Sequence, residues 1–394
     1  MKKSHYKFPL MNNNITKDDI NSLIKFLKKK NIILTQSTNV EKFEKLWSNW
    51  LGVKYSVFVN SGSSANLLSM TALSELYGKG EIIVPSLTWV SDIASVIQTG
   101  NKPVFVDIDL KNLSMNIDQV IDSISEKTKA VFLTHAQGFN GLNTKLLSIL
   151  KKKNIPLIED VCESHGASYK KRKLGSYGIM SNFSFYYAHH MSTIEGGMIC
   201  TNDNYIYQNL RMLRSHGLVR EMTDQKLKKN YINQNKTLNE QFIFSFPAYN
   251  VRSTEINAVI GINQLKSIDK NIKKRNVNHK IFLDNINKNK FITKFDLKGS
   301  SNYAFNLILK KPDFEFANRL MKGMKKKGIE FRQGSAGGGN QLRQPYLKKL
   351  FSKNYFKKFP NTEHVHFFGF YIGNYPDLNK KNILDLCNKI NSIK

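Results

Sequence analysis

Residues 55–68 read YSVFVNSGSSANLL, an apolar β-rich run followed by a small polar turn and the start of a helical pattern. If a strand ends at Asn60 and a helix starts after the turn at residues 61–64, free backbone N–H groups and the positive end of a helix dipole meet at one point. That arrangement suits a phosphate group. A serine-glycine turn that only caps a helix would use the same residue types. The stretch therefore predicts a strand, a turn and a helix, and leaves open whether the turn binds an anion.

Similar apolar runs recur along the first half of the chain, and helical patterns separate them. Several of the runs are continuously apolar, which is typical of strands that are covered on both faces. The runs are YSVFVN, EIIVP, KPVFVDID, AVFLTH, IPLIED, NFSFYY and GGMICT, with helical stretches such as LLSMTALSELYG and TKLLSIL between them. This alternation predicts an α/β fold with a large, mostly parallel central sheet.

The pattern changes near residue 270. One long amphipathic helix is expected from Glu255, in EINAVIGINQLKSIDKNI, and the β-rich segments NYAFNLILK, IEFRQ and HVHFFGFYIG follow it. The chain of 394 residues, 41% of them hydrophobic, is long enough for two cores. We therefore predict a large domain of residues 1–268 and a small α+β domain of residues 269–394.

The chain is strongly basic, with 60 lysines and arginines against 30 acidic residues and a net charge of +30. Clustered basic residues can neutralise the phosphates of nucleic acids. Here they are spread in short runs, as at residues 28–30, 151–153, 170–172 and 325–327, without a zinc-finger spacing or an aromatic RNA-binding signature. We expect no nucleic-acid partner, and a surface that favours small anionic substrates such as nucleotide diphosphates.

Cysteine usage and the N-terminal sequence bear on location. Cys162, Cys200 and Cys387 show neither the pairing of a disulfide framework nor the CxxC spacing of a zinc site. The beginning, MKKSHYKFPLMNNN, lacks the apolar segment of a signal peptide, and no apolar run reaches the length of a membrane span. These features predict a cytoplasmic protein with no membrane contact and no bound metal.

Two further stretches hold candidate site residues. In IPLIEDVCESHG, Asp160 falls where a buried strand would end, which is where ligand crevices form in open α/β sheets. An acid there could hold a cationic ring nitrogen, with Glu163 one helical turn on, or could simply cap the next helix. In NFSFYYAHHMSTIEGGMICT, His189 follows a strand and precedes a glycine turn at residues 195–197. A histidine in that place is either a satisfied core residue or an acid–base group.

The three stretches, in this order, resemble the DegT/DnrJ/EryC1/StrS family of pyridoxal-phosphate-dependent sugar aminotransferases, which have the aspartate aminotransferase fold (fold type I). In that family the phosphate turn reads S-G-T, the strand end reads E-D, and the lysine that binds the cofactor lies in S-F-x-x-x-K before G-E-G-G. Aligning Ser184 with that serine, and residues 195–197 with E-G-G, places His189 at the lysine position. Residues 249–252, YNVR, match the family's Y-N-x-R segment.

Histidine in place of lysine changes the chemistry that the resemblance implies. An imidazole has no amine to bind the cofactor covalently, so the cofactor would be held non-covalently and used as pyridoxamine 5'-phosphate. With an ordinary pKa of about 6.5, the imidazole can act as both base and acid. The histidine-bearing branch that this chain resembles, through LRSHG and GGGNQLRQPYL, consists of 3-dehydratases that make 3-deoxy sugars.

The resemblance thus implies a lyase that removes the 3-hydroxyl group of a nucleotide-linked 4-keto-6-deoxyhexose. The expected substrate is GDP-4-keto-6-deoxy-D-mannose of the colitose pathway, which serves O-antigen and lipopolysaccharide biosynthesis. L-Glutamate would supply the amino group and leave as 2-oxoglutarate, and ammonia would be released. A homodimer with shared active sites is implied as well.

Three alternatives stay open at this point. The first is a sugar aminotransferase that has recruited another lysine, with Lys171 and Lys173 as the nearest candidates upstream. The second is a binding or regulatory relative that has kept the fold without turnover. The third is a histidine-bearing branch that acts on CDP sugars and holds an iron–sulfur cluster on four cysteines, and the three scattered cysteines here disfavour it.

The resemblance also implies roles for individual residues. His189 would be the acid–base catalyst, Asp160 would keep the ring nitrogen protonated, and Asn250 and Arg252 would reach across to the site of a second subunit. The cofactor-binding residues implied are Gly62, Ser63, Trp89, Asp160, Glu163, Ser184 and Asn250. The substrate-binding residues implied are His216, Arg220, Arg252, Glu330 and Arg332.

Overall fold

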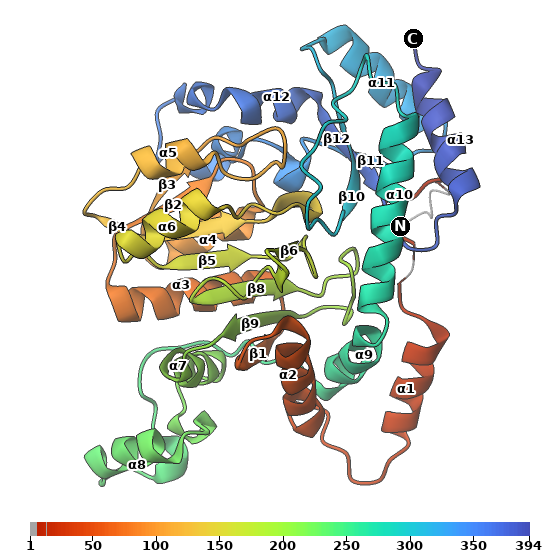
Figure 1. The fold of residues 1–394 in the computed structure, drawn as a ribbon. Helices are drawn as coiled ribbons and strands as arrows, with labels where there is room; N and C mark the ends of the chain where they lie inside the picture. The colour runs from red at the N-terminus through yellow and green to blue at the C-terminus, as the bar shows by residue number, and fades with distance from the viewer. Residues whose placement is uncertain (1–5, 13) are drawn as a thin grey trace.

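A seven-stranded sheet forms the centre of the computed structural model, which describes residues 6–12 and 14–394 (Figure 1). Its strands lie in the order β1-β9-β8-β5-β4-β2-β3, and β9 alone among them runs against the others. The strands are β1 Tyr55–Val59, β2 Glu81–Pro85, β3 Lys102–Val106, β4 Thr128–Thr134, β5 Leu157–Asp160, β8 Met180–Ser184 and β9 Gly197–Thr201. The mostly parallel sheet that the sequence predicts is confirmed.

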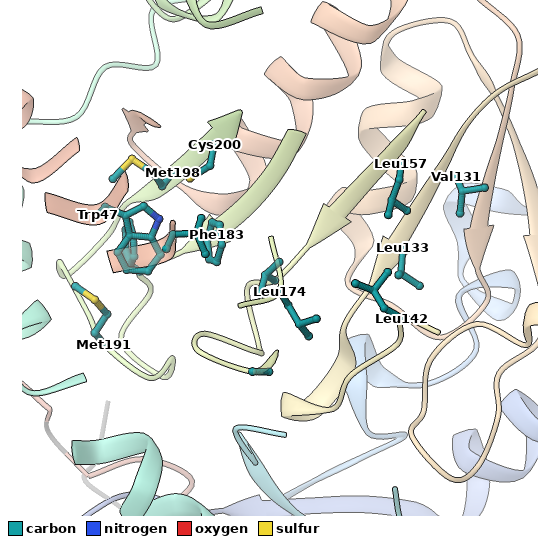
Figure 2. Close-up of a cluster of buried hydrophobic side chains, with 14 of the residues drawn as sticks. Trp47, Val131, Leu133, Leu142, Leu157, Leu174, Phe183, Met191, Met198 and Cys200 are labelled. Carbon is teal, nitrogen blue, oxygen red and sulfur yellow. The ribbon is translucent and has the colours of Figure 1, made fainter. Parts of the chain in front are cut away.

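Helices cover both faces of this sheet, so successive side chains of one strand enter two different cores. Helices α2, α5, α6 and α9 contribute to the first core, and α3, α4 and α7 to the second. On β4, Val131 and Leu133 enter the first core, and Phe132 between them enters the second. Figure 2 shows the first core, in which the rings of Trp47 and Phe183 lie 5.0 Å apart. The helices of this part are α1 Lys17–Leu27, α2 Thr38–Leu51, α3 Gly62–Tyr77, α4 Val90–Gln98, α5 Ile117–Asp122, α6 Thr144–Lys152, α7 Asn204–Arg214, α8 Gln225–Gln234 and α9 Glu255–Leu265.

A three-stranded antiparallel sheet, in the order β10-β12-β11, follows along the chain and has its own core. Its elements are α10 Ile268–Asn285, β10 Ala304–Ile308, α11 Phe314–Lys326, β11 Phe331–Gln333, α12 Pro360–Phe368, β12 Gly369–Gly373 and α13 Lys380–Asn391. Phe8, near the start of the chain, also packs in this core and pairs with Ile329. The division into domains at residues 268 and 269 stays a prediction, and it coincides with the start of α10.

The segment between β11 and α12 returns to the large sheet. Leu342 and Leu347 pack in the second core, and Asn340 pairs with Leu87 just after β2. A Cβ on Gly337 would lie 2.0 Å from a backbone oxygen of the turn after β2, so glycine is required at this contact. The motif GGGNQLRQPYL therefore supports the turn that leads into α4.

Two expectations from the sequence are wrong. The single helix expected from Glu255 is two helices, because the chain turns at residues 266–267, where the hydroxyl and the N–H of Ser267 both donate to the Gln264 carbonyl oxygen. In HVHFFGFYIG, the residues up to Phe368 belong to α12, which Pro360 opens at its first position. In the described part of the chain, no helix is both long and apolar enough to cross a membrane.

Candidate functional site

The ends of three strands meet at one edge of the large sheet. β5 ends at Asp160, its neighbour β8 ends at Ser184, and β1 leads into α3 at Gly62. A Cβ on Gly62 would lie 2.6 Å from the Cβ of Ser184, so the start of α3 touches the end of β8. Parallel strands bring their carboxyl ends to one edge, where open α/β sheets form binding crevices. Residues predicted from three separate stretches are therefore neighbours.

The first turn of α3 has the form of an anion site. Ser61 is its N-cap, and the Ser61 hydroxyl oxygen accepts the N–H of Ser64 at 3.1 Å. Ser63 is exposed, whereas Gly62 is buried without room for a side chain. A Cβ on Gly197 would come within 2.2 Å of the Ser61 carbonyl oxygen, so the glycine turn before β9 packs directly on this turn. The positive end of α3 and the hydroxyl of Ser63 together suit a phosphate group.

Asp160 is buried at the end of β5. Its Oδ1 accepts the N–H of Cys162 at 2.9 Å, and its Oδ2 accepts the Nδ2 of Asn66 at 3.1 Å. Among the residues that the structure describes, no lysine, arginine or histidine forms an ion pair with it. The carboxyl group is fixed in place and can neutralise a cation, such as a protonated ring nitrogen.

Glu163 lies three residues further on, with its carboxyl group against Gln137. Its Oε2 accepts the backbone N–H of Gln137 at 2.8 Å and the side-chain Nε2 at 3.2 Å. Gln137 adopts a φ of 56°, a left-handed conformation that is uncommon for a residue with a side chain. Burial raises the pKa of Glu163 to about 7, against the lowering effect of the hydrogen bonds from Gln137. Near neutral pH this carboxyl group can therefore hold or release a proton.

His189 lies in the loop between β8 and β9, beside Tyr186, His165 and Tyr303. Its ring centroid is 5.8 Å from that of Tyr303 and 6.0 Å from that of His165. The Nδ1 atom of His189 is buried and has no hydrogen-bond partner among the described residues. Burial, and secondly the charge of Arg275, lower the pKa of His189 to about 3. The imidazole is therefore neutral, which is the form that accepts a proton.

Two other histidines next to His189 belong to the core. The Nε2 of His190 lies 3.1 Å from the Ser301 carbonyl oxygen, and His165 packs edge-on against Trp47. Burial lowers the pKa of both well below the ordinary value, so both are neutral. Only 2% of His190 is exposed, whereas His189 keeps part of its surface accessible. Of the adjacent pair, His189 is the one that a ligand can reach.

Trp89 stands at the start of α4, and 58% of it is exposed. An indole buries a large flat area when it stacks on another ring. Its exposure at the end of β2, one strand away from β4 and two from β5, leaves it free to stack on a ligand at this edge of the sheet.

Asn250, Arg252 and His216 come together beside the end of β1. Arg252 pairs with Val59, and its Nε donates to the Oδ1 of Asn250 at 3.0 Å. His216 is exposed, with a φ of 62°, and its backbone N–H donates to the Tyr249 carbonyl oxygen at 2.7 Å. The backbone at Arg252 therefore runs beside the end of β1, which leads into the first turn of α3.

Glu330 and Arg332 approach the site from the small sheet. The Nη1 of Arg332 is 3.3 Å from the Oε1 of Glu330, whose Oε2 accepts the N–H of Leu10 at 2.9 Å. Burial, and next the charge of Glu163, raise the pKa of Tyr371, and the charges of Arg332 and Glu330 act on the same phenol. Tyr371 of β12 lies opposite Arg332 of β11 in the small sheet.

Arg220 contacts a different set of residues. It lies in the short 3-10 helix Val219–Glu221, where its Nη1 donates to the Gln241 carbonyl oxygen at 3.3 Å and its guanidinium lies 5.5 Å from the ring centre of Phe242. The following helix, α8, projects from the body of the molecule (Figure 1). In the described part of the chain, Arg220 contacts none of the other predicted site residues through its side chain.

Five further residues shape the site and were not predicted from the sequence, which are Asn66, Asp92, Gln137, Tyr303 and Tyr371. Asn66 comes one helical turn after the start of α3, and Asp92 lies in the first turn of α4. Helical spacing was therefore a usable signal for these two. The other three lie in segments that are distant in sequence and follow no local pattern, so only the folded chain reveals them.

Comparisons with known proteins agree with this architecture. The DegT/DnrJ/EryC1/StrS aminotransferase family matches residues 13–391. The GDP-4-keto-6-deoxy-D-mannose 3-dehydratase of Yersinia pseudotuberculosis is 32% identical over 401 residues, which cover 99% of this chain and 100% of the relative. A GDP-perosamine synthase of Escherichia coli O157:H7 is 27% identical over 359 residues, which cover 91% of each chain.

Solved structures show the same fold. A crystal structure of GDP-4-keto-6-deoxymannose-3-dehydratase with a trapped PLP-glutamate geminal diamine matches with a TM-score of 0.88 at 30% identity, covering 98% of this chain and 100% of that one. The predicted aminotransferase-like fold is confirmed by this match. The chain belongs to the DegT/DnrJ/EryC1/StrS aminotransferase family.

Proposed function

We propose that this protein is a pyridoxal-phosphate-dependent lyase that removes the 3-hydroxyl group of GDP-4-keto-6-deoxy-D-mannose and uses L-glutamate as amino donor. The observation that carries the proposal is His189, which stands where the family's motif has the cofactor-binding lysine and which a ligand can reach. The dehydratase from Yersinia pseudotuberculosis matches over its whole length and supports the choice of a GDP-linked sugar.

The residues at the edge of the sheet fit pyridoxal or pyridoxamine 5'-phosphate. The turn with Gly62 and Ser63 offers helix-end N–H groups and a hydroxyl to the phosphate, and Ser184 lies against the same turn. The carboxyl group of Asp160 has no cationic partner in the described chain and suits a protonated ring nitrogen. The exposed indole of Trp89 suits a flat ring. The arrangement therefore matches the phosphate, the nitrogen and the face of the cofactor.

The side chains around that position supply the proton transfers. When bound, the cofactor supplies the reacting amine and an electron-withdrawing ring that helps the 3-hydroxyl to depart. The charge of Asp160 keeps the ring nitrogen protonated. The neutral imidazole of His189 takes a proton from the C4′ carbon, and the imidazolium formed then donates to the departing 3-hydroxyl. Because His189 has no primary amine, the site would hold the cofactor without a covalent bond to the chain.

We also infer that two copies of the chain form a homodimer with shared active sites. The arm of residues 219–244 exposes 57% of Phe242 and 58% of Phe244, and clustered exposed aromatic side chains mark interaction surfaces. We infer that Asn250 and Arg252, just after this arm in the sequence, reach the active site of the second subunit. Sedimentation equilibrium should give twice the chain mass, and the double substitution Phe242→Ser and Phe244→Ser should weaken the association. A monomer at micromolar concentration would contradict the inference.

The aminotransferase alternative gains no support from the nearest lysines. The Nζ of Lys173 donates to the Trp50 carbonyl oxygen at 2.7 Å and lies 4.9 Å from the ring centre of Trp50. Lys171 is exposed at the tip of the hairpin formed by β6 Ser168–Tyr169 and β7 Arg172–Lys173. Neither amine contacts His189. The cytoplasmic location stays a prediction.

The function is tested with pyridoxal 5'-phosphate, L-glutamate and GDP-4-keto-6-deoxy-D-mannose. Mass spectrometry should show a sugar nucleotide that has lost one oxygen, and equal amounts of ammonia and 2-oxoglutarate should form. A product that retains nitrogen would establish an aminotransferase instead. Binding of the cofactor without turnover of this sugar or its CDP and dTDP counterparts would support the binding or regulatory alternative.

A further inference from the structure

Asp92 is a buried acid that the reaction described above does not use. It lies in the first turn of α4, three residues after Trp89, and only 1% of it is exposed. Its Oδ2 accepts hydrogen bonds from the hydroxyls of Thr88 and Thr134, the second at 2.6 Å. Its Oδ1 accepts the Nδ2 of Asn66 at 2.7 Å. The turn after β2, strand β4 and helix α3 therefore each provide a hydrogen-bond donor to this carboxyl group.

The amide of Asn66 joins Asp92 to Asp160. The same Nδ2 atom lies 3.1 Å from the Oδ2 of Asp160, so a single amide group bridges the two carboxyl groups. The exposed fractions are 1% for Asp92 and 4% for Asp160, and in the described chain neither has an ion-pair partner. Two carboxyl groups so close together and shielded from water cannot both be ionised. The pair therefore holds one proton at neutral pH.

The surroundings decide which of the two acids holds the proton. Burial, and next the charge of Asp160, raise the pKa of Asp92 well above its ordinary value. The other titratable groups that face Asp92 are Cys162 and Tyr346, whose pKa values are raised chiefly by burial, and neither brings a positive charge. The burial of Asp92 outweighs the hydrogen bonds from the hydroxyls of Thr88 and Thr134, which favour its ionised form. The proton therefore resides on Asp92.

We propose that Asp92 is a positioning residue, which carries the single proton of the carboxyl pair and donates it in a hydrogen bond to Asp160. The donated bond fixes the orientation of the Asp160 carboxylate and leaves the pair with one negative charge. That charge is what a protonated ring nitrogen needs as its partner. This consequence for the cofactor rests on the proposed function, whereas the shared proton itself does not require the cofactor.

Infrared spectroscopy of the cofactor-free protein tests the shared proton directly. At about pH 8.5, where Glu163 with its pKa of about 7 has released its proton, the wild type should still show the carbonyl stretch of a protonated carboxyl group. The substitution Asp92→Asn, which keeps the shape, should remove this band. The matched control is Asp107→Asn, in which the band should persist. Asp107 is equally buried, but it accepts the N–H groups of residues 361 and 362, and among the described residues no hydrogen bond links it to another carboxyl group. A wild type without the band, or a band that survives in Asp92→Asn, would overturn the proposal.

The pH dependence of unfolding gives a second test that needs no substrate. Because the folded pKa of Asp92 is raised, the folded chain keeps a proton that the unfolded chain releases above about pH 4, so this group destabilises the fold as pH rises. The urea midpoint of the wild type should fall relative to that of Asp92→Asn between about pH 5 and pH 8. Asp160→Asn should reduce the same decline, because it removes the second charge. Parallel pH profiles of wild type and Asp92→Asn would overturn the proposal, even if the enzyme proved to be a dehydratase.

Discussion

The floor and the rim of the site differ in how their residues are held. On the floor, Asp160 and Glu163 each accept two hydrogen bonds, and Asp160 is buried while Glu163 is half-buried. On the rim, 58% of Trp89 is exposed, the side chain of Arg332 is 56% exposed, and the Nε of Arg252 donates to Asn250. The floor residues therefore find their hydrogen-bond partners within one chain, whereas the rim residues have exposed side-chain surface that can contact a ligand or a second subunit.

This difference separates two kinds of effect. A change on the floor should alter proton transfer or the stability of the fold, because its groups are already desolvated and paired. A change on the rim should alter binding and leave stability nearly unchanged, because exposed side chains contribute little to folding. The distinction between floor and rim would fail if a rim substitution lowered stability, or if a floor substitution changed only the binding of substrate.

The largest effect on the reaction rate is expected at His189, which a ligand on the floor of the site can reach. His189→Asn removes the only acid–base group assigned to the reaction and should lower the rate of 3-hydroxyl loss by roughly 10²–10⁴-fold or more. Its unfolding midpoint should stay near that of the wild type. His190→Asn is the matched control, since it disturbs the contact with Ser301 and should cost about 1 kcal/mol of stability with little change in rate. If the His189→Asn variant removed the 3-hydroxyl group at a rate close to that of the wild type, the assignment of His189 as the acid–base group would be wrong.

Glu163→Gln should change how the stability of the fold responds to pH. The folded pKa of Glu163, about 7, lies above the ordinary value of 4.5, so its contribution to stability is present below about pH 4.5 and is lost as pH rises to about 7. A glutamine side chain does not titrate, so the variant shows no such decrease in stability as pH rises. The unfolding free energy of the variant, relative to the wild type, should therefore grow by about 3 kcal/mol between about pH 4 and pH 8. Urea titrations at several pH values measure it, and a constant difference would refute the prediction.

Arg252→Ala should act on binding alone. A hydrogen bond from a charged group to a substrate phosphate contributes about 2 kcal/mol, so KM for the nucleotide sugar should rise roughly 30-fold with little change in kcat. Arg319→Ala is the control and should leave KM unchanged, because this exposed side chain on α11 contacts Glu315, the Lys394 carbonyl oxygen and the ring of Phe316. A loss of stability in Arg252→Ala would show that this residue belongs to the floor.

The sequence predicted the parts of the site that local patterns encode. Apolar runs and the turn at residues 61–64 located the sheet and the start of α3, and the family's motif spacing singled out His189. The proximity of Asp92 and Asp160 could not be predicted from the sequence, because the two residues lie on different elements and meet only after the sheet and α4 have packed. The hydrogen bonds between Gln137 and Glu163 could not be predicted for the same reason. The break after α9 was missed because no glycine or proline marks it, and a serine hydrogen bond makes the turn instead.

The smallest effect is expected at Lys173, which separates the histidine enzyme from one that uses a recruited lysine. Lys173→Met removes a hydrogen bond to Trp50 and a cation–π contact at the surface, which together should cost about 1 kcal/mol of stability. Activity should persist, because the amine contacts Trp50 rather than the strand ends. Reduction with borohydride in the presence of pyridoxal 5'-phosphate should leave no cofactor attached to the wild-type chain in the site. Covalent trapping that disappears in Lys173→Met would instead identify this lysine as the cofactor ligand, and His189 would then have to serve a different step.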